Sequence, residues 1–137
     1  MNRADLLLMT DERLADAQVL WAGERWAFAY YVAGYAVECA LKACVLSRMV
    51  HTGLVFERKL PEFRTHKLND LIEIAGLRTE LNARQSDGTG FAVNWDRVVK
   101  WTEESRYSDR SESEAEKLLA AITEPTDGVL AWLRPFM

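Results

Sequence analysis

One stretch of about 25 residues, beginning at Trp21 or Glu24 and ending at Arg48, constrains the fold more than any other part of the sequence. It is rich in Ala and Leu, and Gly34 is its only helix-breaking residue, so it predicts a helix roughly 37 Å long at about 1.5 Å per residue. Apolar residues occur on nearly every side of this helix, which means that most of its faces must be buried. Its longest apolar run, from Ala27 to Val37, is shorter than the roughly 20 residues needed to span a bilayer. The stretch therefore predicts the core helix of a protein that does not enter the membrane.

Four polar or aromatic side chains form a narrow stripe on this helix, because spacings of three and four residues return to the same face. They are Tyr31, Tyr35, Glu38 and Lys42. Glu38 has apolar neighbours in the sequence, and a carboxylate in such surroundings needs a cation or several hydrogen-bond donors to stay ionised. Lys42 and Arg106 are its natural partners, either in a structural buried ion pair or in a functional cleft. Gly34 lies beside the stripe and would let another backbone approach closely.

Shorter helical patterns account for most of the remaining chain. Residues 5–20 have a partial apolar face with an expected break near Thr10, a residue that can cap the second half. Thr65 is the expected N-cap of a short helix that ends at Gly76 in a left-handed cap. A second short helix is expected from Leu77 to Arg84.

Loop signals separate these segments. The helical pattern is lost between His51 and Arg64, and residues 86–90 are rich in Gly, Ser and Asp, so both segments are expected to be loops. Asn94 is then expected to cap a helix that continues through Trp101.

The last helix is expected to begin at one of two alternative capping boxes, Ser111 with Glu114 or Ser113 with Glu116. Pro125 lacks the backbone N–H that an uninterrupted helix needs there, so it predicts a kink or two consecutive helices. Strand patterns are not convincing anywhere in the sequence. The chain is therefore expected to be one all-α domain spanning residues 1–137, an up-and-down bundle of about five helices around one long central helix.

Composition agrees with an ordinary globular protein. The chain has 137 residues, the size of a single domain, with 49% apolar and 28% charged residues. A formal net charge of −4 argues against a protein that coats nucleic acid non-specifically. The acidic N-terminal region does not fit a signal peptide, so a cytoplasmic location is expected.

The sequence lacks the common motifs for cofactors and metals. It has no phosphate-binding loop, no dinucleotide fingerprint, no hydrolase elbow and no zinc-protease motif, so no cofactor is expected. Cys39 and Cys44 are five positions apart, and on a helix they point in directions that exclude a disulfide between them. With only His51 and His66 to join them, no zinc site of the usual spacing can form.

Two further segments carry residues that could do chemistry. His66 lies at a helix start, where it either bonds the adjacent loop or serves as an acid, a base or a phosphate contact. Trp101 and Tyr107 are expected to pack the last helix against the long one, and Arg106 suits either a phosphate or Glu38. The candidate polar cluster therefore comprises Glu38, Lys42, His66, Arg106 and Tyr107.

Three motifs, taken in order, resemble those of HEPN domains. The segment from Ala29 to Ala43 resembles the long second helix of the prokaryotic branch, with its G-Y-x-x-E-x-x-L-K core. His66-Lys67-Leu68-x2-Leu71 resembles the H-x-L-x-x-L segment that follows it. Trp101-x4-Arg106-Tyr107 resembles the W…RY that precedes the final helix. Together the motifs span most of the chain, in the order and spacing of the family.

The resemblance implies a bundle of about five helices that pairs as a homodimer. Members of the family include RNA-cleaving toxins and the partners of minimal nucleotidyltransferases, often in toxin–antitoxin operons or defence systems. Catalytic members carry an R-x4-6-H signature near the start of the last helix. No histidine follows Arg106 or Arg110 after four to six intervening residues, so the signature is absent. The many aromatic and small residues on the long helix also favour a homodimer, since one small bundle can hardly bury them all.

Three functions follow as hypotheses. The first is a non-catalytic or divergent HEPN protein that binds RNA, a nucleotide or a protein partner through the polar cluster. The second is a metal-independent endoribonuclease with a non-standard site, in which His66 is the base and Lys42 or Arg106 stabilises the developing negative charge. The third is a structural homodimer that scaffolds a nucleotidyltransferase or an antitoxin-like partner.

Overall fold

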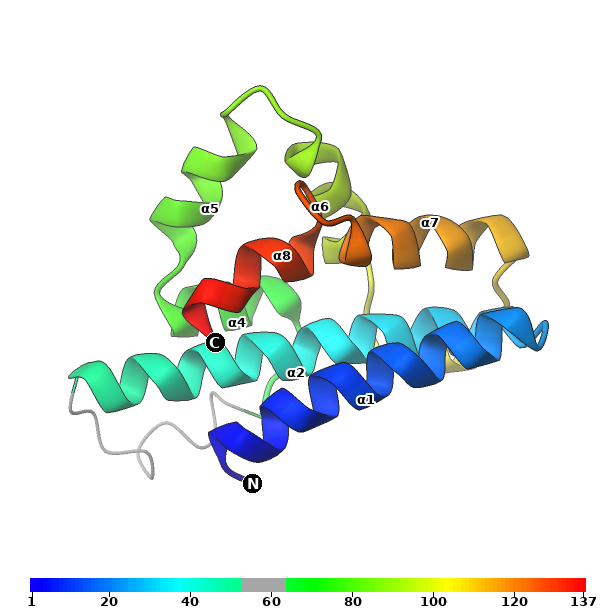
Figure 1. The fold of residues 1–137 in the computed structure, drawn as a ribbon, viewed down its shortest axis with the longest axis horizontal. Coiled ribbons are helices and arrows are strands. Elements are labelled where there is room, and N and C mark those ends of the chain that lie inside the picture. The colour runs from blue at the N-terminus through cyan, green and yellow to red at the C-terminus, as the bar shows by residue number, and fades with distance from the viewer. Residues whose placement is uncertain (53–63) are drawn as a thin grey trace.

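A computed structural model describes residues 1–52 and 64–137, and every regular element within these ranges is helical (Figure 1). The α-helices are α1 (Arg3–Ala22), α2 (Trp26–Thr52), α4 (Leu68–Ala75), α5 (Arg78–Gln85), α6 (Phe91–Val99), α7 (Glu112–Thr123) and α8 (Val129–Leu133). Two short 3-10 helices, η2 (Glu103–Tyr107) and η3 (Arg134–Phe136), follow α6 and α8. The all-α prediction is confirmed. The described ranges hold seven α-helices, however, where about five were expected.

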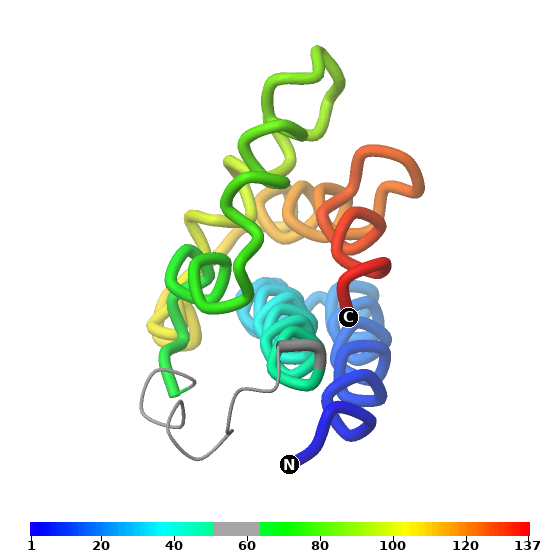
Figure 2. Tube along the Cα trace, turned by 90° about the vertical axis from the view of Figure 1, so that its left-hand side faces the viewer, coloured from blue at the N-terminus to red at the C-terminus, as the bar shows by residue number. Residues whose placement is uncertain are grey.

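The long helix is the centre of the molecule, as predicted. α1 and α2 lie side by side and run in opposite directions, while α4 and the C-terminal helices cover other sides of α2 (Figures 1 and 2). α2 is long and apolar enough to cross a membrane, but 83% of its most apolar window is buried inside the molecule. Its apolar residues therefore form the core. The loop predicted between His51 and Arg64 lies outside the described residues, except that His51 and Thr52 belong to α2.

α1 is continuous, so the predicted break near Thr10 is wrong. Asn2 is the N-cap and forms a capping box with Asp5. The buried Thr10 hydroxyl donates to the carbonyl of Leu6, at 2.8 Å, within the same helix. A threonine can satisfy its hydroxyl in this way without ending the helix.

Two further predicted caps are also wrong. The N-cap of α4 is Lys67, and the hydroxyl of Thr65 instead accepts from the backbone N–H of Lys67 at 3.2 Å. Asn94 lies inside α6, where its side-chain amide donates to the carbonyl of Asp127 at 3.0 Å. Thr65 therefore accepts from a backbone N–H outside the helix, whereas Asn94 acts as a donor to a backbone carbonyl.

The predicted ends of two other helices are confirmed. Gly76 follows α4 with φ of 71°, a left-handed conformation that glycine adopts without strain. Of the two alternative capping boxes, Ser111 with Glu114 begins α7. Of the two outcomes predicted at Pro125, a kink or two consecutive helices, the structure has two helices. α7 ends at Thr123, and α8 begins at Val129.

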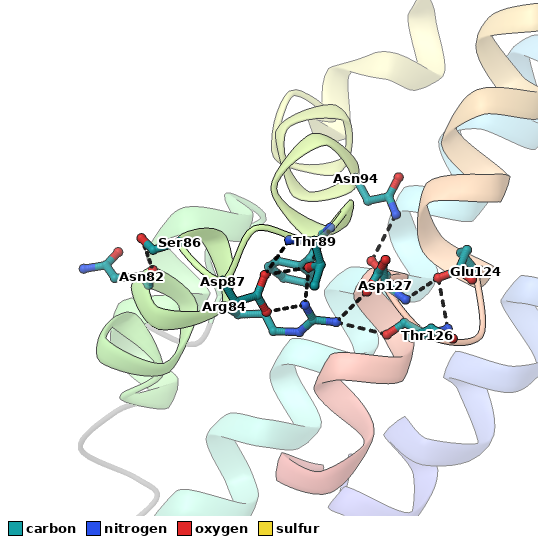
Figure 3. Close-up of polar contacts among 10 residues, drawn as sticks. Asn82, Arg84, Ser86, Asp87, Thr89, Asn94, Glu124, Thr126 and Asp127 are labelled. Atoms are coloured by element: carbon teal, nitrogen blue, oxygen red, sulfur yellow. Dashed lines mark hydrogen bonds and ion pairs between the residues drawn. The ribbon is translucent and has the colours of Figure 1, made fainter.

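The turn between α7 and α8 is held by an arginine from a distant helix (Figure 3). Arg84 of α5 donates to Asp87 and Thr89 at 2.6 Å each. It also donates to the carbonyl of Thr126 and the carboxylate of Asp127, at 3.0 Å each. One side chain therefore ties the α5–α6 loop to the α7–α8 turn.

Candidate functional site

Glu38 is buried in the middle of α2 and has two cationic or ionisable partners. Only 1% of the residue is exposed. Its Oε2 lies 3.3 Å from Nζ of Lys42, one helical turn later, and its Oε1 lies 2.9 Å from Nδ1 of His66. Lys42 is thus confirmed as a partner. The second partner is His66, whereas the sequence had suggested Arg106.

His66 lies between two carboxylates. Its other ring nitrogen, Nε2, is 3.3 Å from Oε2 of Glu103 in η2. The contact of Nδ1 with Glu38 is a hydrogen bond, whereas the contact of Nε2 with Glu103 is an ion pair only when the ring is protonated. His66 therefore joins α2 to η2 through Glu38 and Glu103.

The position of His66 follows from the packing of α4. Leu68, Leu71 and Ile72 form the buried face of this helix, which packs against α2. Since His66 lies two residues before Leu68, docking of that face brings the imidazole beside the polar stripe. The sequence predicts both the polar stripe and α4. It does not give the distance between the stripe and His66, because that distance depends on the segment that connects α2 to α4.

Arg106 contacts the stripe at Tyr31, about two helical turns before Glu38. Burial raises the pKa of the Tyr31 hydroxyl above its ordinary value, and the positive charge of Arg106, which also hydrogen-bonds this hydroxyl, acts in the opposite direction. Nη2 of Arg106 is 3.9 Å from Oε1 of Glu103, its ion-pair partner within the described residues. Glu103 therefore connects Arg106 with His66. The sequence analysis missed this role of Glu103, although an acidic residue between Trp101 and Arg106 was its signal.

Tyr107 does not pack the last helix against α2, so that expectation is wrong. The residue is 77% exposed, and the guanidinium of Arg106 lies 4.8 Å from the centre of its ring. Trp101 packs against the long helix, because it is buried and its Nε1 donates to the carbonyl of Tyr31 at 3.2 Å. Gly34 admits the indole of Trp101, where another backbone was expected.

A cleft of about 330 Å³ opens beside His66. Its lining residues come from the segment before α4 and from η2 and its N-cap: Thr65, His66, Lys67, Thr102, Glu103 and Glu104. The two carboxylates balance the cationic groups, so the cleft lacks the surplus of positive charge that an extended phosphate backbone would need. A ligand in this cleft would therefore meet a histidine together with both acidic and basic side chains.

Comparison of the chain with protein-family models, with curated proteins and with solved structures gives no match.

The geometry restricts the chemistry that the cluster can perform. The Glu38–His66 contact resembles a base held by a carboxylate, but Nε2, the nitrogen that would take a proton, is occupied by Glu103. Burial raises the pKa of the Cys39 thiol to about 11 and that of Cys44 to about 12, which disfavours a thiolate nucleophile. Among the described residues, no group of three or more His, Cys, Asp or Glu side chains could hold a metal ion. The arrangement suits binding better than proton transfer.

Proposed function

We propose that this chain is a HEPN-like domain that binds RNA or a nucleotide and does not cleave it. The exposed Arg106–Tyr107 pair at the edge of the polar cluster carries the proposal. An exposed tyrosine offers a ring on which a base can stack, and an adjacent guanidinium suits a phosphate. No packing contact within the described core accounts for Tyr107, whereas a ligand would.

The cluster beneath this pair acts as its support. Glu103 contacts both Arg106 and His66, and His66 is in turn bound to the buried Glu38. This connection fixes η2 against α2, so that the Arg106–Tyr107 pair is presented from a rigid base. The occupied Nε2 of His66 favours binding over cleavage.

Fluorescence anisotropy with a labelled single-stranded ten-nucleotide RNA, together with competition by ATP, tests the proposal. Base stacking on an aromatic ring contributes roughly 1–3 kcal/mol, so Tyr107→Ala should weaken RNA binding about tenfold or more, while Tyr107→Phe should retain it. Arg106→Gln should weaken binding, and Arg78→Gln, a matched change on α5, should not. Absence of binding at micromolar concentrations by both RNA and ATP would overturn the proposal.

The same samples separate binding from cleavage. We expect the RNA to stay intact during long incubation with the wild-type protein. RNA cleavage that is lost in His66→Ala would instead establish the endoribonuclease alternative. The scaffolding alternative rests on the resemblance alone, since no contact among the described residues favours it.

The proposal includes a homodimer, which the resemblance implies. The aromatic and small residues of α2 do not require a second copy of the chain, because most of them are buried within a single chain. The remaining support is the pair of exposed apolar residues Val19 and Phe28, which line a cleft between α1 and α2. Sedimentation should give twice the chain mass of 15.7 kDa, and the V19D/F28D double variant should give a monomer. A wild-type monomer would remove the dimer from the proposal.

A further inference from the structure

A second cleft, of about 350 Å³, concentrates positive charge between α6 and α7. It is lined by Tyr30, Arg97, Lys100, Arg110, Glu114, Lys117 and Leu118. Four of these seven residues are cationic and one is anionic, although the whole chain has a formal net charge of −4. The cleft therefore has the opposite sign to the molecule that contains it.

Among the described residues, three of the four cations in this cleft are paired only weakly or not at all with acidic side chains, and Arg110 is paired with Glu114. Arg97 and Lys117 are exposed and form no ion pair within the described part of the chain. Lys100 pairs with Asp96 at 3.1 Å, but both side chains are mostly exposed, and such a pair is weak. Positive charge is therefore available to a ligand from two helices.

Arg110 forms the inner wall of the cleft. Its guanidinium lies 4.3 Å from the centre of the buried Tyr30 ring, and its Nη1 donates to Glu114 at 3.1 Å. Its Nε is buried and has no hydrogen-bond acceptor among the described residues. The cation–π contact with the Tyr30 ring holds the guanidinium at the wall of the cleft.

We propose that this cleft is a phosphate-binding site, distinct from the Arg106–Tyr107 pair. A phosphate group presents several acceptor oxygens, and a polyphosphate also carries more charge than a carboxylate, which suits convergent Arg and Lys side chains. The site takes either a free polyphosphate or the backbone phosphate of RNA. In the second case the inference deepens the proposed function, because Arg110 lies three residues beyond Tyr107 and both sites could contact one strand.

Inorganic tripolyphosphate is the first probe, because it carries the phosphates without a base. Isothermal titration at low salt should detect binding, and the double variant R97Q/K117Q should weaken it about tenfold or more. The matched control is R78Q/R134Q, which removes the same charge from surface ion pairs outside the cleft and should change affinity less than twofold. Tyr107→Ala should leave tripolyphosphate binding unchanged. The phosphate site and the proposed function are therefore tested independently of each other.

The labelled RNA is the second probe and identifies the source of the phosphate. If R97Q/K117Q weakens RNA binding as well, the site takes backbone phosphates, and about three such contacts predict a loss of roughly 20-fold in affinity for a fourfold rise in salt. If only tripolyphosphate binding weakens, the site takes a free polyphosphate. Either result supports the proposal.

Three results would overturn it. The first is no binding of either probe at millimolar concentrations. The second is an equal loss of affinity in R97Q/K117Q and R78Q/R134Q, which would mean that only the overall charge matters. The third is tighter binding of a poly-glutamate peptide than of tripolyphosphate with the same dependence on Arg97 and Lys117, which would assign the cleft to an acidic protein segment.

Discussion

Nδ1 of His66 lies 2.9 Å from Oε1 of Glu38, although the two residues are 28 positions apart in the sequence. The contact joins the segment before α4 to the middle of the central helix. It also gives a buried carboxylate its second polar partner, beside Lys42. Hydrogen bonds to a charged group contribute roughly 1.5–3 kcal/mol, more than a neutral pair, so this contact should be measurable in the stability of the fold.

A double-mutant cycle with Glu38→Gln and His66→Ala measures that contact. We expect His66→Ala to lower the free energy of unfolding by about 1–3 kcal/mol, because it leaves Glu38 buried with one fewer partner. The coupling energy between the two changes should be about 1–2 kcal/mol by urea denaturation. The exposed Asp96–Lys100 pair is the control and should give less than about 0.5 kcal/mol. Additive effects of Glu38→Gln and His66→Ala would show that the two side chains do not interact.

Gly34→Ala should destabilise the protein by about 1–3 kcal/mol, because a Cβ at this position would overlap the indole of Trp101. In an exposed helix interior the same change would be favourable by roughly 1 kcal/mol, so the sign of the effect is diagnostic. Gly23→Ala is the control, since its Cβ would make only ordinary contacts. Thermal unfolding that is unchanged or improved in Gly34→Ala would contradict the observed packing.

The central helix and its polar stripe could be predicted because both are local properties. Helical spacing alone places Tyr31, Glu38 and Lys42 on one face, and apolar neighbours alone indicate that Glu38 is buried. The position of His66 relative to Glu38 is a non-local property. It depends on how α4 docks and on a connecting segment whose path no spacing rule gives.

Errors in the predicted caps have a common physical cause. Thr10, Thr65 and Asn94 each carry a short polar side chain that can bond to several nearby backbone groups. The sequence reveals that chemistry but not which group is in reach. Tyr107 was misplaced for a related reason, since an aromatic residue near a helix start is equally compatible with core packing and with a surface role. Glu103 became part of the site only through the fold of η2.

Arg84→Ala should lower the free energy of unfolding by about 1–2 kcal/mol, because four acceptors from two loops lose their common donor. Arg84→Lys should recover little, since an ammonium cannot reproduce the geometry of the guanidinium fork. Arg78→Ala on the same helix is the control and should cost less than about 0.5 kcal/mol, because Arg78 bonds Glu73 and Asn69 of one neighbouring helix and its side chain is 36% exposed, against 21% for Arg84. Equal losses for Arg84→Ala and Arg78→Ala in urea denaturation would refute a special role for Arg84.

The two cysteines predict a loss of stability at alkaline pH. Burial raises the pKa of Cys39 to about 11 and that of Cys44 to about 12, whereas a thiol in the unfolded chain titrates near 8.5. Above that value the unfolded state loses its protons first, so ionisation stabilises it relative to the folded state. The contribution of the two protonated thiols to the free energy of unfolding is complete below about pH 8.5. It is lost as the pH rises toward the pKa values of the thiols in the folded state.

Urea denaturation at pH 8, 9 and 10 tests this dependence. Each thiol should reduce the free energy of unfolding by about 1–2 kcal/mol between pH 8 and 10. Burial also raises the pKa values of Tyr31 and Tyr35, so the loss should continue above pH 10. The double variant C39A/C44A starts from a different stability because core volume is removed, and the slope with pH is therefore the quantity to compare. A slope as steep in the double variant as in the wild type would mean that the thiols are not the groups responsible.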